Sequence, residues 1–394
     1  EHTAVFQLSG PNCIFPERLA SAFATIPSPT AVEKYGSDFG RNPAGTGAFE
    51  FVEWVPDVRI ALKRNEDYWN KEDIHLERLI FRPIPENTTR LILLEQGVLD
   101  IADIAFSHVN IAEETDDIIL QSAPLLSVRY IGFNTQKPPF DDRRVRQAAN
   151  YAVNKEDMVE YMFFGVGEPA WGVFPSTLPD FNPDTIQYEY NPEKARQLLD
   201  EAGYPNGFKA VMWTKEMGTY RISADAVVEY LRDVGIDVEV KILDNAVYWD
   251  KFDEYLTPEG DMYPTKEGAY DIYVGAWVGG EAAHGFLEPL FKGHSYSNSS
   301  FYDVPEVNQL LKDFKKLPTP GQRRAVYYKL QEIIMRDAPW IFASHGQANV
   351  GLRDRVKGFE VSGAGWIFFE DVRVVDEEPA EQREPAVAAA KEPE

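Results

Sequence analysis

The chain has 394 residues, 44 % of them hydrophobic, and a formal net charge of −25. Single cores seldom grow past roughly 250–300 residues, so we expect at least two domains. The acidic balance, without a segregated basic face, argues against a nucleic-acid or anionic-membrane partner. Because Cys13 is the only cysteine, an intrachain disulfide and a thiolate metal cluster are excluded.

The first third of the chain predicts strands joined by short turns and helices. Residues 3–29 predict a strand, a turn and a short helix. Residues 42–65 predict a hairpin, because glycines supply turn conformations and apolar residues alternate along its two strands. A strand at 76–85 follows, then a helix capped at Asn87 that leads to a short strand at 99–102.

The stretch from Tyr130 to Val153 predicts a strand, a break at Pro138 and Pro139, and a helix. Its apolar residues recur at helical spacing on one face, so its arginines fall on the opposite face or at its margin. We interpret these arginines as solvated partners of an acidic surface rather than as an anion-binding site. They are Arg143, Arg144 and Arg146.

The rest of the chain predicts an alternation of helices and strands. A helix from about Ile222 to Val234 between two apolar runs predicts a strand–helix–strand unit. Residues 271–277 predict a buried strand. Further helices are predicted at 154–165, 191–203, 306–315 and 322–336, and closing strands at 356–361 and 372–375. Residues 376–394, rich in Pro, Ala and Glu, predict a disordered acidic tail.

Seven segments together carry a resemblance to a known family. They are NPAGTGAFEFVEW, RNEDYWN, EQGVLDIAD, GFNTQKPPFDDRRVRQAANYAVNKEDMV, NPEKARQLLDEAGYPNGF, AWVGG and YKLQEIIMRDAPWI. With these motifs in this order, the chain resembles an extracytoplasmic solute-binding protein of family 5, over residues 3–375. That group contains the oligopeptide-, dipeptide- and nickel-binding proteins of ABC importers.

The resemblance implies an α/β protein with a two-lobe, periplasmic-binding-protein-like fold of type II and a ligand cleft between the lobes. Residues 43–129 and 356–375 are expected to form an incomplete first lobe, and residues 130–355 the second. Residues 1–42 are expected to be a remnant of the N-terminal extra domain and its connection. Family members carry a signal peptide and a longer N-terminal region, so we expect a chain truncated at its N-terminus.

The resemblance also suggests how the ligand is held. In peptide-binding members, an aspartate that pairs with the ligand's ammonium follows a strand tryptophan by three residues. In the oligopeptide type, an arginine precedes that tryptophan by three. Here the tryptophan is Trp277, and the two charged positions are Gly280 and Val274. We interpret the missing charges as a sign of a neutral oligosaccharide held by stacking, or of a peptide held mainly through its backbone.

Aromatic and polar residues supply the candidate ligand contacts. Trp277 is the first choice, with a core position as its alternative. Glu281 is the candidate replacement for the missing aspartate. Its alternative is a solvated loop carboxylate. Trp171 is a further candidate, at a position where the family usually has a small residue. The remaining candidates, each of which could equally be a packing residue, are Tyr130, Asn134, Asn245, Trp249, Trp366 and Phe368.

Motifs for metal binding and catalysis are missing. The six histidines lack metal-binding spacing, so no metal site is expected, although His284 beside Glu281 is a pair to watch. Without G-x-S-x-G, H-E-x-x-H or a Cys–His arrangement, we expect neither an enzyme nor a cofactor.

The expected function follows from the resemblance. A monomer outside the cytoplasmic membrane, periplasmic or lipid-anchored, would capture a peptide or oligosaccharide and deliver it to an ABC transporter membrane permease. The alternative is a sensor or interaction protein that kept the solute-binding fold and lost transport.

Overall fold

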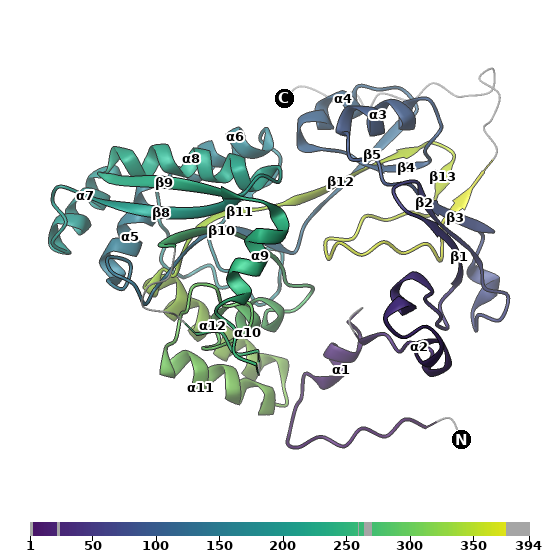
Figure 1. Ribbon diagram of the computed structural model, residues 1–394, viewed down its shortest axis with the longest axis horizontal. Coiled ribbons are helices and arrows are strands. Elements are labelled where there is room, and N and C mark those ends of the chain that lie inside the picture. Colours follow the sequence, from purple (N-terminus) through teal and green to yellow (C-terminus); the bar gives the residue numbers. More distant parts are fainter. Residues whose placement is uncertain (1–2, 22–23, 259, 264–269, 376–394) are drawn as a thin grey trace, which may run out of the picture. The chain divides into compact units, whose positions relative to one another are not determined.

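The chain forms two compact units in the computed structural model, which describes residues 3–21, 24–258, 260–263 and 270–375 (Figure 1). Unit 1 contains the described residues of 1–25, 122–348 and 362–366. Unit 2 contains those of 26–121, 349–361 and 367–394. The predicted tail at 376–394 lies outside the described residues, and the lobe boundaries drawn from the sequence stay a prediction.

Unit 1 is built on a six-stranded mixed sheet with the order β7-β11-β6-β10-β8-β9. Strand β6 runs antiparallel to β10 and β11, whereas β8 runs parallel to β10 and β9. One end of the sheet therefore contains the C-terminal ends of β8, β10 and β11 together with the N-terminal end of β6. The strands are β6 (Ser127–Phe133), β7 (Glu168–Pro169), β8 (Phe208–Lys215), β9 (Ile236–Leu243), β10 (Ile272–Val278) and β11 (Trp340–His345).

Helices cover this sheet on both faces (Figure 1). Helix α8 packs against β8, β9 and β10, and α6 packs against α8, while α10 packs against β10 and α11. The helices of unit 1 are α1 (Phe15–Leu19), α5 (Arg143–Ala152), α6 (Lys155–Phe163), α7 (Pro192–Glu201), α8 (Thr219–Asp233), α9 (Asn245–Asp253), α10 (His284–Phe291), α11 (Pro305–Asp313) and α12 (Pro320–Asp337).

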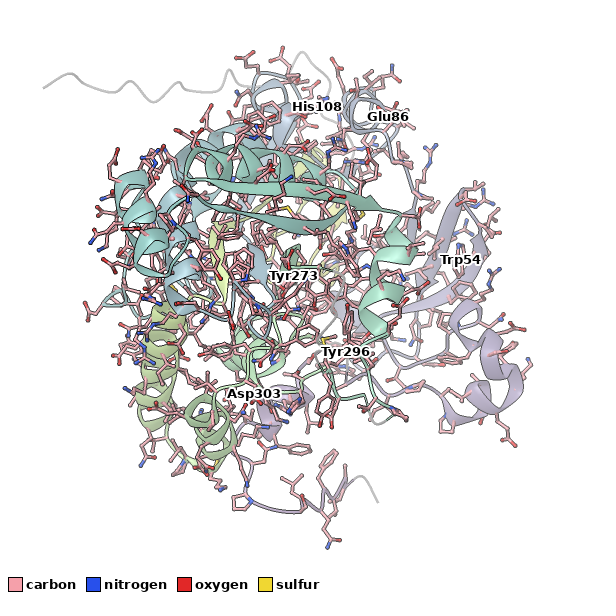
Figure 2. The ribbon with its side chains drawn as sticks, turned by 60° about the vertical axis from the view of Figure 1, so that its left-hand side comes forward. Trp54, Glu86, His108, Tyr273, Tyr296 and Asp303 are labelled. Atoms are coloured by element: carbon pink, nitrogen blue, oxygen red, sulfur yellow. The ribbon has the colours of Figure 1, made fainter. Side chains whose placement is uncertain are left out.

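Aromatic residues dominate the core of unit 1. Tyr130 stacks on Trp340 with ring centroids 3.7 Å apart and meets Tyr273 edge-on at 5.9 Å. Tyr273 lies in the interior of the unit, in contrast to the exposed Tyr296 (Figure 2). Buried hydroxyl groups find acceptors, as when the Tyr248 hydroxyl donates to the carbonyl of Val274 at 2.6 Å. Much of the chain's aromatic content therefore serves packing.

The arginine-rich stretch behaves only partly as expected. The predicted strand and helix are confirmed as β6 and α5, and the Asp142 carboxylate caps α5 by accepting from Arg144 N at 2.8 Å. The solvated position predicted for Arg146 is wrong, because this residue is only 6 % exposed. Its guanidinium donates to the carbonyls of Asp337 and Phe140. Helical spacing cannot reveal carbonyls that a distant segment brings to the helix margin.

The described residues of unit 2 contribute to three small sheets. Strands β1 (Phe49–Val55), β2 (Arg59–Arg64) and β3 (Arg78–Phe81) form one antiparallel sheet, whose first two strands are the predicted hairpin. A second sheet has the order β4-β12-β5, and β13 pairs with β14. These strands are β4 (Ile101–Asp103), β5 (Ile118–Pro124), β12 (Gln347–Arg353), β13 (Val356–Lys357) and β14 (Arg373–Val374).

Short helices complete unit 2, and two local predictions differ from the structure. The helices are α2 (Pro29–Tyr35), α3 (Asn87–Glu95) and α4 (Val109–Glu113), and the 3-10 helices of the chain include η2 (Gly36–Arg41), η3 (Lys71–Asp73), η4 (Phe106–His108) and η5 (Phe314–Lys316). Asn87 is the first residue of α3 rather than its cap, and Glu86 at the cap position makes no side-chain hydrogen bond. The strand predicted near the N-terminus is not formed in the described residues there.

Candidate ligand-binding site

The predicted ligand contacts fall in several different places of the structure. Tyr130 and Asn134 are buried in unit 1, where Tyr130 stacks on Trp340 and the Asn134 Oδ1 accepts from Gln136 N at 3.2 Å. Glu281 and Trp366 are exposed in unit 1, and Phe368 is exposed in unit 2.

Trp277 lies near the C-terminal end of β10, at the end of the sheet where β8 and β11 also finish, and is partly buried against the aromatic core. Its Nε1 donates to the carbonyl of Gly285 at 2.8 Å. The indole is thus held by its own unit, with part of its surface still accessible. Gly280, at the position of the missing aspartate, adopts a positive φ of 72° that favours glycine.

Trp249 and Asn245 belong to a cluster around the side chain of Lys215, the last residue of β8. Lys215 is 3 % exposed, and its Nζ donates to Asn245 Oδ1 at 2.9 Å. The same Nζ lies 4.2 Å from the ring centroid of Tyr220 and 4.8 Å from that of Trp249. Aromatic faces stabilise a cation electrostatically, but they do not neutralise its charge.

Arg129 brings a second cation to this cluster from the start of β6. Its guanidinium carbon lies 4.5 Å from the ring centroid of Tyr220, the ring that Lys215 Nζ also approaches. Nη2 donates to Thr219 Oγ1 at 2.7 Å, but Nε and Nη1 are buried without a hydrogen-bond partner. Because arginine has only donors, these two nitrogens can donate to a ligand acceptor, with the Tyr220 side chain as their near neighbour in the chain.

The electrostatics of the cluster favour an anion. In the described residues neither Arg129 nor Lys215 forms an ion pair with a carboxylate. Burial lowers the pKa of Arg129, and burial together with repulsion from Arg129 lowers the pKa of Lys215. Thr219 is the first residue of the long helix α8, so the partial positive charge of that helix end adds to the same region. A bound carboxylate would satisfy donors and reduce the repulsion together.

Sequence reasoning missed both cations of this Arg129–Lys215 cluster, although a signal was present. Arg129 interrupts the apolar strand around Tyr130, and Lys215 ends the apolar run that begins at Phe208. A charge inside a strand expected to be buried needs a partner. The carboxylate that follows Lys215 in sequence, Glu216, pairs with Arg221 instead. The positions of Gly280 and Val274 led instead to the expectation of a neutral oligosaccharide or of a peptide held mainly through its backbone.

Trp171 and the histidines lie outside this cluster. The Trp171 ring has Lys155 Nζ 4.7 Å from its centroid. His284 Nδ1 lies 3.7 Å from the Glu17 carboxylate, and burial lowers the pKa of this imidazole to about 4. Within the described ranges no three His, Cys, Asp or Glu side chains gather as potential metal ligands, and no helix is long and apolar enough to cross a membrane.

Comparisons with known proteins find glutathione-binding proteins among the relatives of this chain. The chain is 31 % identical over 385 residues to the glutathione-binding protein GsiB of Pectobacterium atrosepticum, covering 95 % of this chain and 72 % of the relative. It is 31 % identical to GsiB of Shigella flexneri, covering 86 % of this chain and 66 % of that protein. The chain therefore spans about two thirds to three quarters of the length of these relatives.

Solved structures agree with these relatives. The periplasmic binding protein DppA of Helicobacter pylori, in complex with the peptide STSA, has a TM-score of 0.81 and 28 % identity, covering 94 % of this chain and 72 % of that one. A dipeptide-binding protein from a Pseudoalteromonas species, in complex with Met-Leu, has a TM-score of 0.78 and 25 % identity, covering 92 % and 72 %. These likenesses confirm the predicted α/β, two-lobe fold class.

A family model for bacterial extracellular solute-binding proteins, family 5, matches residues 1–298. The match spans most of the chain and agrees with the resemblance found in the seven sequence segments. The chain belongs to the bacterial extracellular solute-binding proteins of family 5.

Proposed function

We propose that this chain captures a short peptide with a free carboxylate outside the cytoplasmic membrane, for delivery to the membrane permease of an ABC importer. The observation that carries the proposal is the Arg129–Lys215 cluster, with buried donors and no carboxylate partner in the described residues. The peptide complexes of similar structures and the glutathione-binding relatives support this substrate class.

A neutral oligosaccharide fits this cluster less well. Sugar hydroxyls can accept hydrogen bonds from Arg129, but they leave two neighbouring positive charges without compensation. The expectation of a neutral ligand rested on the missing charges at Gly280 and Val274. Arg129 and Lys215 provide positive charges elsewhere in the chain, which argues against that expectation. The alternative function, a sensor or interaction protein without a transport role, has no observation in its favour. That the chain acts as a monomer and delivers its ligand to a permease stays part of the proposal.

Calorimetric titration of short peptides tests the proposal. Each peptide is compared with its C-terminally amidated form, which keeps the shape and removes the negative charge. Because hydrogen bonds to charged groups are worth roughly 1.5–3 kcal/mol, amidation should weaken binding about tenfold or more. Equal affinities for the two forms, or binding of oligosaccharides alone, would contradict the proposal.

A further inference from the structure

A pocket of about 270 Å³ lies at the edge of the unit 1 sheet where β7 pairs with β11. Its apolar walls are Trp171, Phe181 and Pro169, with Pro183 beside them, and its polar lining includes Glu168, Gln187 and His345. The pocket is partly open and large enough for one amino-acid side chain or a chain end. None of its lining residues belongs to the Arg129–Lys215 cluster.

His345 presents an acceptor without a donor. Its Nδ1 lies 2.9 Å from the carbonyl oxygen of Ser127, which can only accept, so Nδ1 carries the proton. Burial lowers the pKa of the imidazole to about 4, so the ring is neutral at neutral pH and Nε2 carries a lone pair. Nε2 is buried without a partner in the described residues, and His345 is 4 % exposed. Leaving such an acceptor unpaired is unfavourable, and a ligand donor would remove the penalty.

Gln187 and Glu168 add further acceptors to the lining, which also contains the hydroxyl of Ser176. Gln187 Nε2 donates to the carbonyl of Thr185 at 3.1 Å, which leaves its Oε1 available. Glu168 is exposed and forms no ion pair with a described residue. A carboxylate, an amide oxygen and an imidazole lone pair between aromatic walls suit a positively charged nitrogen with several N–H groups.

Lys155 approaches the pocket from α6 without being part of its lining. Its Nζ donates to the carbonyl of Ala170 at 3.2 Å and lies 4.7 Å from the Trp171 ring centroid. Burial lowers the pKa of Lys155 to about 7, which limits its repulsion of a ligand cation near neutral pH. The acceptors of the lining therefore remain the dominant recognition groups.

We propose that this pocket binds the cationic nitrogen of the peptide, either its amino end or a basic side chain, while the carboxylate binds Arg129 and Lys215. The inference rests on the proposed function. It orients the ligand, with its cationic nitrogen at the pocket and its carboxylate at the Arg129–Lys215 cluster. Ser127, whose carbonyl holds His345, is two residues from Arg129 on β6, and Ser344 pairs with Arg129 across the strands. The preferred ligand is therefore zwitterionic.

The test compares three probe peptides by calorimetry: Ala-Ala-Ala, its N-acetyl form, and N-acetyl-Ala-Lys-Ala. In the wild type, N-acetylation of Ala-Ala-Ala should weaken binding about tenfold, because a charged hydrogen-bonded group is lost. Recovery of affinity with the lysine peptide would identify the basic side chain as the occupant, and no recovery would identify the amino end.

Glu168→Gln provides the variant, and Glu160→Gln provides the control, since Glu160 is an exposed carboxylate of unit 1 outside the pocket lining. Glu168→Gln should weaken the two probes with a cationic nitrogen by only about threefold, because the Glu168 carboxylate is exposed. The affinity of N-acetyl-Ala-Ala-Ala, which keeps its carboxylate but lacks a cationic nitrogen, should change little. Glu160→Gln should change neither. Nitrogen NMR of the imidazole supplies a second readout, since the Nε2 resonance of His345 should shift when the cationic probe donates to it.

Two results would overturn the pocket assignment. One is equal affinity for Ala-Ala-Ala and its N-acetyl form in both variants. The other is a His345 Nε2 resonance that does not shift when Ala-Ala-Ala saturates the protein. In either case a retained preference for free over amidated peptides would leave the proposed function standing. Conversely, equal affinity for free and amidated peptides, with N-acetylation still weakening binding, would refute the carboxylate site alone. If no peptide binds at all, both the pocket assignment and the proposed function are refuted.

Discussion

Replacing Lys155 by Met should change the pH dependence of stability in a defined direction. The Lys155 side chain is 1 % exposed, and none of its described contacts is a carboxylate: its Nζ meets the Ala170 carbonyl and the rings of Trp171 and Tyr188. Burial lowers its pKa from 10.5 to about 7 in the folded chain. That difference corresponds to roughly 5 kcal/mol against folding when the unfolded side chain is protonated.

The sign follows from proton counting. Between about pH 7 and 10.5 the unfolded lysine holds a proton that the folded one has largely released, so the free energy of unfolding rises with pH. From pH 7 to 9 the wild type should gain about 2 kcal/mol relative to Lys155→Met. Buried tyrosines such as Tyr248 and Tyr270, whose pKa values burial raises, act in the opposite direction at higher pH, so the comparison stops at pH 9.

The assay is urea unfolding at several pH values, followed by the fluorescence of the buried Trp213 and Trp340 in unit 1. Lys241→Met, which removes an exposed lysine of β9, is the matched control and should keep the wild-type pH slope. An identical slope in Lys155→Met and the wild type would refute the reasoning. It would mean that Lys155 stays protonated in the folded chain because its carbonyl and ring contacts compensate for burial.

Three further predictions concern the packing of unit 1. Arg146→Met should lower the free energy of unfolding by roughly 3 kcal/mol or more in urea titrations, because it leaves buried carbonyls without donors, whereas an unchanged midpoint would contradict the assigned bonds. Gly207→Ala would place its Cβ 1.8 Å from the Gly235 carbonyl oxygen, so thermal melting should show a much larger loss than for Gly203→Ala, where the φ is also positive but no atom lies within 4 Å. Burial lowers the pKa of His284 to about 4 from 6.5, so the unfolded state takes up its proton first and stability falls from pH 6.5 to 4; His284→Phe should remove up to roughly 3 kcal/mol of that fall, and an unchanged acid profile would refute the assignment.

Local sequence patterns were sufficient for many elements of the fold but not for their arrangement. The sequence predicts helix α12 at 322–336, and the structure extends it to Pro320–Asp337, with Thr319 as its cap. The position of β6 between β10 and β11 does not follow from local patterns, because these strands are brought together from distant parts of the chain. Pairing across such separations depends on tertiary packing, which a single sequence displays only through motifs already known to occur together.

The candidate site shows the same division. Aromatic candidates were accessible to sequence reasoning because tryptophans are few, yet the fold uses Tyr130 for stacking on Trp340. Arg129 and Lys215 come from different strands, and only the sheet places both against Tyr220. The absence of a compensating carboxylate in the described residues is a three-dimensional property. What the sequence offers is the anomaly of a charge within an apolar strand.

The central claim is that Arg129 and Lys215 bind the carboxylate of a peptide. The direct test is a calorimetric cycle in which wild type, Lys215→Met and the control Lys241→Met are each titrated with a peptide and its amide. The account predicts that Lys215→Met weakens the free peptide about tenfold, leaves the amide nearly unchanged and so removes most of the discrimination seen in the wild type and the control. Equal weakening of both forms, or full discrimination in Lys215→Met, would contradict it.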